Sequence, residues 1–118
     1  MPKTPSRLLV ACFCAAWCRT CDDYARVIEL LKTRYAEQVD FLWVDIEAQS
    51  DVLDNVDVEN FPTLLISDAQ KVYFWGTVLP HAVTASQLID RVLAGDIRTL
   101  HAPDIVQLDQ RLRSTFSC

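Results

Sequence analysis

The sequence lacks several features that would identify large classes of protein. It has only two glycines among 118 residues, so its tight turns must rely on Asp, Asn and Pro. No apolar run approaches the ~20 residues that a membrane span needs, and the run at residues 8–11 is shorter than the ~7–15 residues of a secretory signal. The formal net charge is −5, which disfavours nucleic acid and anionic membrane surfaces as partners.

What is present is typical of a globular domain with an unusual set of cysteines. Hydrophobic residues make up 51% of the chain and charged residues 23%, which suits one domain with one core. The five cysteines are Cys12, Cys14, Cys18, Cys21 and Cys118. Their odd number and the crowding of four of them argue against a secreted disulfide framework and favour the reducing cytoplasm.

Apolar periodicity and turn residues predict the order of the elements. We expect strands over residues 7–14, 40–46, 63–66 and 72–75, and helices over 18–38, 50–55, 84–95 and from 104 onward. Thr84 to Gln87 forms a capping box, and Gly95 is expected to end the helix that it opens. In that helix the residues expected to point inward are Leu88, Ile89, Val92 and Leu93. A β-α-β unit followed by a β-β-α unit predicts an α/β fold, with a mixed sheet of about four strands and helices on its faces.

The segment Trp17-Cys18-Arg19-Thr20-Cys21 carries the chemistry. It lies between a predicted strand and a predicted helix, where free backbone N–H groups and the helix dipole favour a thiolate. Cys18 is therefore expected to be the nucleophile, and Cys21, one turn along, can close a disulfide with it. This arrangement indicates dithiol–disulfide exchange. A buried structural pair or half of a zinc site is the alternative.

Three motifs together resemble the thioredoxin-like proteins. Ala16 to Cys21 is similar to the family's active-site motif, Phe61-Pro62-Thr63 to its cis-proline loop, and Gly76 to a glycine beside the active site. The resemblance runs from about Leu8 to Gly95. It implies a thioredoxin-like domain over residues 1–95, without the family's first strand and helix. Residues 96–118 would form a C-terminal helical extension packed on that domain.

The resemblance also implies the substrate-binding residues. Pro62 would lie against the Cys18–Cys21 pair with a cis peptide bond, which would expose the backbone of Phe61 for strand-like pairing with a substrate. Trp17 would be an exposed docking surface. Thr63, Gly76 and Thr77 would belong to the same groove. An ordinary strand-start proline, a core tryptophan and a turn glycine are the alternatives.

The chain also departs from the family's pattern. Arg19 and Thr20 replace the usual Gly-Pro between the cysteines, and Cys12 stands where typical members have a buried aspartate. We expect these three residues to tune the redox chemistry. Trp43 replaces the lysine that pairs with that aspartate, and Cys14 replaces a tryptophan.

The four crowded cysteines spell Cys-x-Cys-x3-Cys-x2-Cys, which raises the alternative of a metal site. Cys12 and Cys14 are two apart on a predicted strand, so they should point to one face. The strand should hold them apart from the helical pair, so we expect small core residues and no metal. Cys118 is expected to be a reactive tail thiol.

These patterns together predict a protein-disulfide oxidoreductase that mainly reduces protein disulfides. It would carry no bound cofactor, act as a monomer and receive electrons from a reductase of the thioredoxin-reductase type. The alternatives are a redox-sensing or protein-binding module without turnover and, less favoured, a metal-binding module.

Overall fold

The computed structural model describes residues 8–54, 56–68 and 71–116. The elements run in the order β1 (Leu8–Cys14), α1 (Arg19–Arg34), β2 (Val39–Asp45), α2 (Ser50–Leu53), β3 (Thr63–Ser67), β4 (Val72–Thr77), α3 (Ala82–Ala94) and α4 (Pro103–Phe116). This is the predicted order. None of the helices in these ranges is long and apolar enough to cross a membrane.

The strands form one mixed sheet in the order β2-β1-β3-β4. β1 pairs in parallel with β2 and antiparallel with β3, and β3 pairs antiparallel with β4. Every residue of β1 is buried, as expected of a central strand covered on both faces. The prediction of a thioredoxin-like α/β fold with a mixed four-stranded sheet is confirmed.

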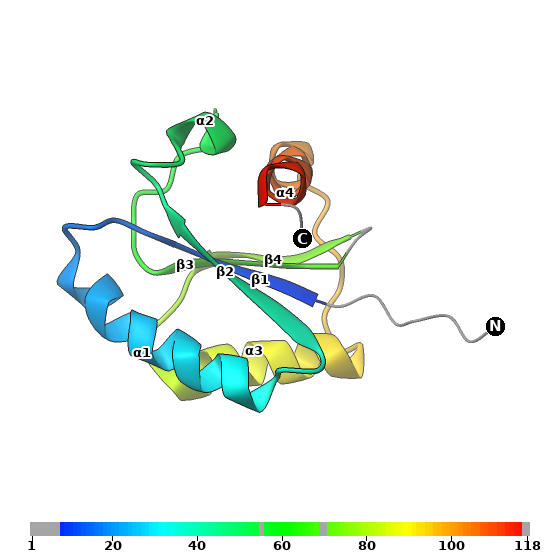
Figure 1. Cartoon of the computed structure of the whole chain (residues 1–118). Helices are drawn as coiled ribbons and strands as arrows, with labels where there is room; N and C mark the ends of the chain where they lie inside the picture. Colours follow the sequence, from blue (N-terminus) through cyan, green and yellow to red (C-terminus); the bar gives the residue numbers. More distant parts are fainter. Residues whose placement is uncertain (1–7, 55, 69–70, 117–118) are drawn as a thin grey trace.

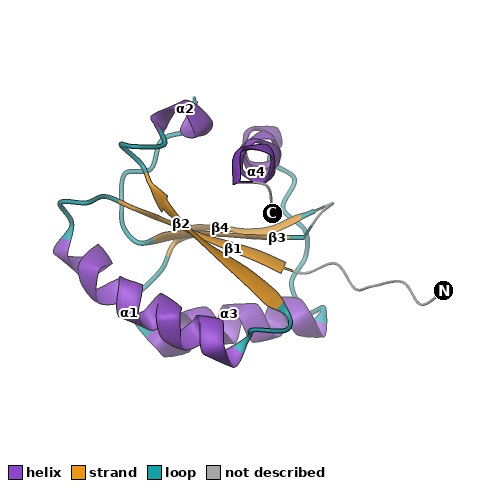
Figure 2. Cartoon of the chain, in the orientation of Figure 1, coloured by secondary structure: helices purple, strands orange, loops and turns teal. Residues whose placement is uncertain are grey.

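Helices cover both faces of the sheet, with α1 and α3 on one side and α2 and α4 on the other (Figures 1 and 2). Alternate residues of β1 pack into two hydrophobic cores, one on each face of the sheet. Cys12 and Cys14 belong to the core under α1 and α3, whereas Phe13 belongs to the core under α2 and α4. The expectation that the two cysteines share one face is therefore confirmed.

Two helix starts differ from the sequence prediction. α3 begins at Ala82, after an extended His81 without a side-chain cap, so the capping box expected at Thr84 lies inside the helix. α4 begins at Pro103, one residue before the expected cap, because proline has the φ of a first helical residue and no N–H to satisfy.

The other end of α3 follows its prediction more closely. Gly95 has a left-handed φ of 79° and ends the helix as expected. The prediction that Leu93 points inward is wrong: it is exposed, while Ile89 and Val92 fill the core. Leu93 follows Val92 directly on a helix, and this 100° step carries it off the buried stripe.

Candidate active site

Cys18 lies at the junction between β1 and α1. It is the N-cap residue of α1, with an extended backbone (φ −91°, ψ 117°), and it is a free, partly exposed thiol. Its N–H donates to the carbonyl of Ala15 at 3.1 Å, and its carbonyl accepts from the N–H of Asp22 at 3.3 Å. These bonds hold the cysteine at the start of the helix, beside the N–H groups of its first turn.

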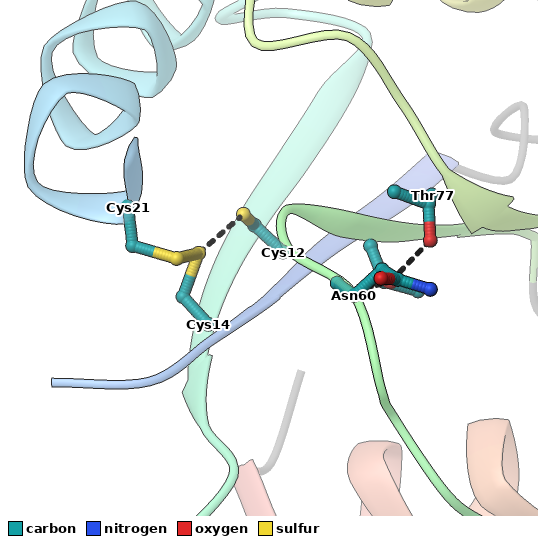
Figure 3. The surroundings of a disulfide bond; sticks show 6 residues. Cys12, Cys14, Cys21, Asn60 and Thr77 are labelled. Atoms are coloured by element: carbon teal, nitrogen blue, oxygen red, sulfur yellow. Dashed lines mark hydrogen bonds between the residues drawn. A yellow bond between two sulfur atoms is a disulfide. The ribbon is translucent and has the colours of Figure 1, made fainter. Parts of the chain in front are cut away.

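Cys21 lies one turn inside α1 and is bonded to Cys14, the last residue of β1. Figure 3 shows this disulfide joining the helix to the strand. The two Cα atoms are 5.8 Å apart and both side chains are 1% exposed. The expectation that the strand and the helix keep their cysteines apart is wrong, because α1 packs its buried face directly on β1. Cys14 is therefore more than a small core residue.

Cys12 points towards this disulfide (Figure 3), and its Sγ is 3.8 Å from the Sγ of Cys14. Since a disulfide sulfur carries no hydrogen, the thiol of Cys12 is the donor in this contact. Burial raises the pKa of Cys12 from an ordinary 9.0 to about 12, so it is a neutral thiol near neutral pH. Within the described residues, no group of three or more His, Cys, Asp or Glu side chains is arranged so that it could hold a metal ion.

The loop before β3 carries the second part of the predicted site. The Phe61–Pro62 peptide bond is cis. The carbonyl of Pro62 accepts from the N–H of Val78 at 3.0 Å. The hydroxyl of Thr63 donates to the carbonyl of Asn60 at 2.6 Å and lies 3.3 Å from the hydroxyl of Thr77. These contacts attach the loop to the end of β4.

Trp17 connects the two parts of the site. Its side chain is 68% exposed, and its ring meets the ring of Phe61 edge to face, with centroids 5.6 Å apart. Arg19 is exposed and Thr20 half-buried at the start of α1. The cysteine segment and the cis-proline loop are thus neighbours at one end of the sheet.

Gly76, on β4, lies opposite Leu64 of β3. It contributes to a groove of about 370 Å³ beside the cis-proline loop. The groove is lined by Thr63, Gly76, Thr77, Trp75 and the segment 57–60. Two acids, Asp57 and Glu59, give it a negative lining. The structure therefore places Gly76 and Thr77 beside Thr63, whereas Trp17, Phe61 and Pro62 do not line this groove.

Two residues near the cysteines were not predicted to belong to the site. For Cys14, the only indication in the sequence is that it lies close to Cys18 and Cys21. Tyr24, one turn after Cys21, is fully buried, and its pKa is raised by burial and by the neighbouring Cys12. Its hydroxyl is the one buried side-chain polar atom of the described chain with no hydrogen-bond partner.

The chain is similar to known proteins both in sequence and in fold. The family model Thioredoxin matches residues 3–90. No curated protein matches the sequence. The fold resembles that of the germline-specific thioredoxin Deadhead from Drosophila melanogaster, with a TM-score of 0.67 and 16% identity over 75% of this chain and 83% of that one.

Two further thioredoxin structures are similar. The thioredoxin of Trypanosoma brucei brucei has a TM-score of 0.66 and 24% identity over 75% of this chain and 77% of its own. The thioredoxin of Fasciola hepatica has a TM-score of 0.65 and 24% identity over 73% and 81%. At these identities the likeness establishes the fold, while the match of the family model, which spans most of the sequence, establishes the family. The chain belongs to the thioredoxin family, whose members are thiol–disulfide oxidoreductases.

Proposed function

We propose that this protein reduces disulfide bonds in other proteins through Cys18 and Cys21. The observation that carries the proposal is the position of Cys18. It is a free, partly exposed thiol at the N-cap of α1, one turn before a buried cysteine of the same helix. An accessible sulfur beside helical N–H groups is suited to be the attacking thiolate.

Cys18 would attack one sulfur of a substrate disulfide and release the other as a thiolate. Cys21 would then attack the sulfur of Cys18, form a Cys18–Cys21 disulfide and release the reduced substrate. The burial of Cys21 suits this second role, because a shielded thiol does not compete with Cys18 for substrates. Arg19 and Thr20, between the two cysteines, and Cys12, beneath them, would tune the reduction potential.

The substrate would bind across Trp17 and the loop of Phe61, Pro62 and Thr63. The exposed indole of Trp17 offers an apolar surface next to Cys18, and its contact with Phe61 joins the two loops. Gly76 and Thr77 would line the adjoining groove. Because Asp57 and Glu59 make that groove acidic, we expect basic or neutral protein segments to bind better than acidic ones.

We further propose the setting in which the protein works. A monomer without a bound cofactor would receive electrons from a reductase of the thioredoxin-reductase type. The odd number of cysteines and their crowding support a cytoplasmic location.

Reduction of insulin disulfides by dithiothreitol, with the protein in catalytic amounts, tests the proposal. Wild type is expected to accelerate the reduction, and Cys18→Ser is expected to lower the rate to that of dithiothreitol alone, since no other exposed thiol of the described chain lies at this site. Cys118→Ser removes a thiol outside the described residues and serves as the matched control, with an unchanged rate. Equal rates for wild type and Cys18→Ser would refute catalysis by Cys18.

A redox-sensing module without turnover is the second candidate. The disulfide between Cys14 and Cys21 favours it, because this bond occupies the cysteine that would resolve a mixed disulfide. Trapping separates the two functions. Cys21→Ser should accumulate mixed disulfides with substrates if the protein turns over, whereas Cys18→Ser should not. A sensor would form no such adducts with either variant.

A further inference from the structure

Cys21 has two possible disulfide partners. On its own helix Cys18 is three residues earlier, a spacing at which side chains on a helix are neighbours. From β1, Cys14 reaches it across the interface between strand and helix, and in the structure this second bond is the one formed (Figure 3). Cys18 is left as a thiol at the surface end of the site.

We propose that Cys14 is a third redox-active cysteine, which takes over the disulfide from Cys18 after each reduction of a substrate. This inference rests on the proposed function, because it begins from the Cys18–Cys21 disulfide that turnover leaves behind. Its product is the form seen in the structure, in which the disulfide lies in the core and Cys18 is free again.

The transfer is a disulfide exchange that needs no outside oxidant or reductant. The thiolate of Cys14 attacks the Sγ of Cys21, a Cys14–Cys21 bond forms, the Cys18–Cys21 bond breaks, and Cys18 leaves as a thiolate. One disulfide and one thiol are present before and after the step. The proton that Cys14 loses is taken up by the departing sulfur of Cys18 or by water.

The second buried thiol, Cys12, is close enough to compete but is poorly suited to attack. Its sulfur lies 3.8 Å from that of Cys14. Only a thiolate attacks a disulfide, and burial raises the pKa of Cys12 to about 12, so it stays protonated near neutral pH. Its S–H is instead placed to donate to the sulfur of Cys14. Such a donor stabilises Cys14 as a thiolate whenever the Cys14–Cys21 bond is broken.

Storage in the core controls how the protein is reduced again. Cys14 and Cys21 are each 1% exposed, so a protein reductant cannot reach their sulfur atoms directly. The exchange must run backwards: Cys18 attacks Cys21, and the disulfide returns to the partly exposed Cys18. Cys18 would thus be both the nucleophile for substrates and the gate for reduction of the stored disulfide.

Disulfide mapping of the oxidised wild-type protein tests the inference without any variant. The protein is oxidised with excess diamide, denatured in N-ethylmaleimide to block free thiols, and digested with trypsin. Cleavage after Arg19 and Arg26 separates peptide 8–19, with three cysteines, from peptide 20–26, with Cys21 alone. Backbone fragmentation of the disulfide-linked peptides, at bonds between Cys14 and Cys18, then shows which of these two cysteines carries the maleimide.

The expected major species has maleimide on Cys18 and a bond between Cys14 and Cys21. A major species with maleimide on Cys14 and a bond between Cys18 and Cys21 would overturn the inference while leaving the proposed function intact. The insulin assay reports that function separately, so the two failures are distinguishable. Cys118→Ser is the matched control, because Cys118 has no part in the proposed exchange, and its oxidised form should still contain the Cys14–Cys21 bond.

The gating role of Cys18 has its own measurement. In oxidised Cys18→Ser the Cys14–Cys21 bond should be reduced by dithiothreitol at least about tenfold more slowly than in wild type, because the sulfur that brings it to the surface is missing. A rate equal to that of wild type would show that the buried bond is reduced directly and would contradict the proposal that its reduction passes through Cys18. The same peptides, sampled over time, give both rates.

Discussion

The ring of Trp17 meets the ring of Phe61 edge to face, at an angle of 84° and with centroids 5.6 Å apart. Trp17 precedes Cys18, and Phe61 precedes Pro62, so this pair joins the segment that contains Cys18 to the cis-proline loop. Such aromatic pairs contribute about 0.5–1.5 kcal/mol beyond their buried area. The contact therefore helps to hold the two loops together.

Trp17→Ala should weaken substrate binding more than it lowers the reactivity of the Cys18 thiol. We expect the KM for a protein disulfide to rise about three- to tenfold, which corresponds to the loss of the exposed ring and its contact. The rate at which iodoacetamide alkylates Cys18 in the reduced variant should change little. Steady-state insulin reduction and timed alkylation measure the two effects.

Leu30→Ala is a matched control for Trp17→Ala, because Leu30 is a similarly exposed large apolar residue (66%) farther along α1. Its KM should equal that of wild type. If both variants raise the KM alike, the effect is one of general surface hydrophobicity rather than of a docking surface at Cys18.

The hydroxyl of Tyr24 is buried without a hydrogen-bond partner in the described chain, whereas that of Tyr35 donates to Asp90 at 2.6 Å and lies 2.8 Å from the hydroxyl of Ser86. Removing an unsatisfied polar group should be neutral or favourable. We expect Tyr24→Phe to leave the free energy of unfolding unchanged or to raise it by up to about 1 kcal/mol. Tyr35→Phe, the matched control, should lower it by about 1–2 kcal/mol. Urea unfolding gives both values, and a large loss in Tyr24→Phe would reveal a partner for its hydroxyl.

The order of the strands and helices could be predicted from the sequence because each follows from local periodicity and turn residues. One example is the apolar face of α1, whose spacing predicts that five residues point inward. Four of them are buried and Val27 is partly buried; the four are Tyr24, Ile28, Leu31 and Tyr35. Cys18 could likewise be placed at a helix start, because the change from strand to helix is visible in the spacing of apolar residues.

The partner of Cys21 could not be predicted in the same way. It depends on how closely α1 packs on the end of β1, and that distance is set by the whole core rather than by the six residues between Cys14 and Cys21. The predicted start of α3 was also wrong, since the helix begins at Ala82 although Thr84 has the better local capping signal.

Cys12 should make the fold sensitive to alkaline pH. Its pKa of about 12 in the folded protein exceeds the ordinary 9.0, so above about pH 9 the unfolded chain loses a proton that the folded protein keeps. The stabilisation is complete below pH 9 and is lost as the pH rises towards 12. The free energy of unfolding should therefore fall by up to about 1.4 kcal/mol per pH unit in this range through Cys12 alone.

Urea unfolding between pH 8 and pH 10 measures this slope. A Cys18→Ser, Cys118→Ser background removes the ionisation of those two cysteines, and Cys12→Ala is compared within it. Tyrosine ionisation also destabilises the fold but begins nearer pH 10, since the ordinary tyrosine pKa is 10.0. The variant should show the smaller slope below pH 10. Identical slopes would mean that Cys12 ionises as readily in the folded protein as in the unfolded chain.

Asp109 anchors α4 to the sheet, on the face opposite the cysteines. The hydroxyl of Ser67, at the end of β3, donates to one oxygen of the Asp109 carboxylate at 2.5 Å. Arg113 donates to the other carboxylate oxygen at 3.2 Å and to the oxygen of Ser67 at 2.9 Å. Asp109 and Ser67 are both buried, so these polar groups depend on one another for hydrogen bonds.

Asp109→Ala should therefore lower the free energy of unfolding by about 2–4 kcal/mol, because it leaves the Ser67 hydroxyl without its acceptor and the Arg113 guanidinium with the Ser67 oxygen alone. Asp109→Asn keeps one acceptor and the shape of the side chain, so it should lower the free energy of unfolding by less than Asp109→Ala does. Lys32→Ala breaks the exposed pair with Glu29 and is the matched control, with a loss of about 0.5 kcal/mol or less. A loss in Asp109→Ala as small as that of Lys32→Ala would mean that apolar contacts alone hold α4. Since α4 lies on the other face of the sheet, iodoacetamide should still label Cys18 at the wild-type rate in every one of these variants that remains folded.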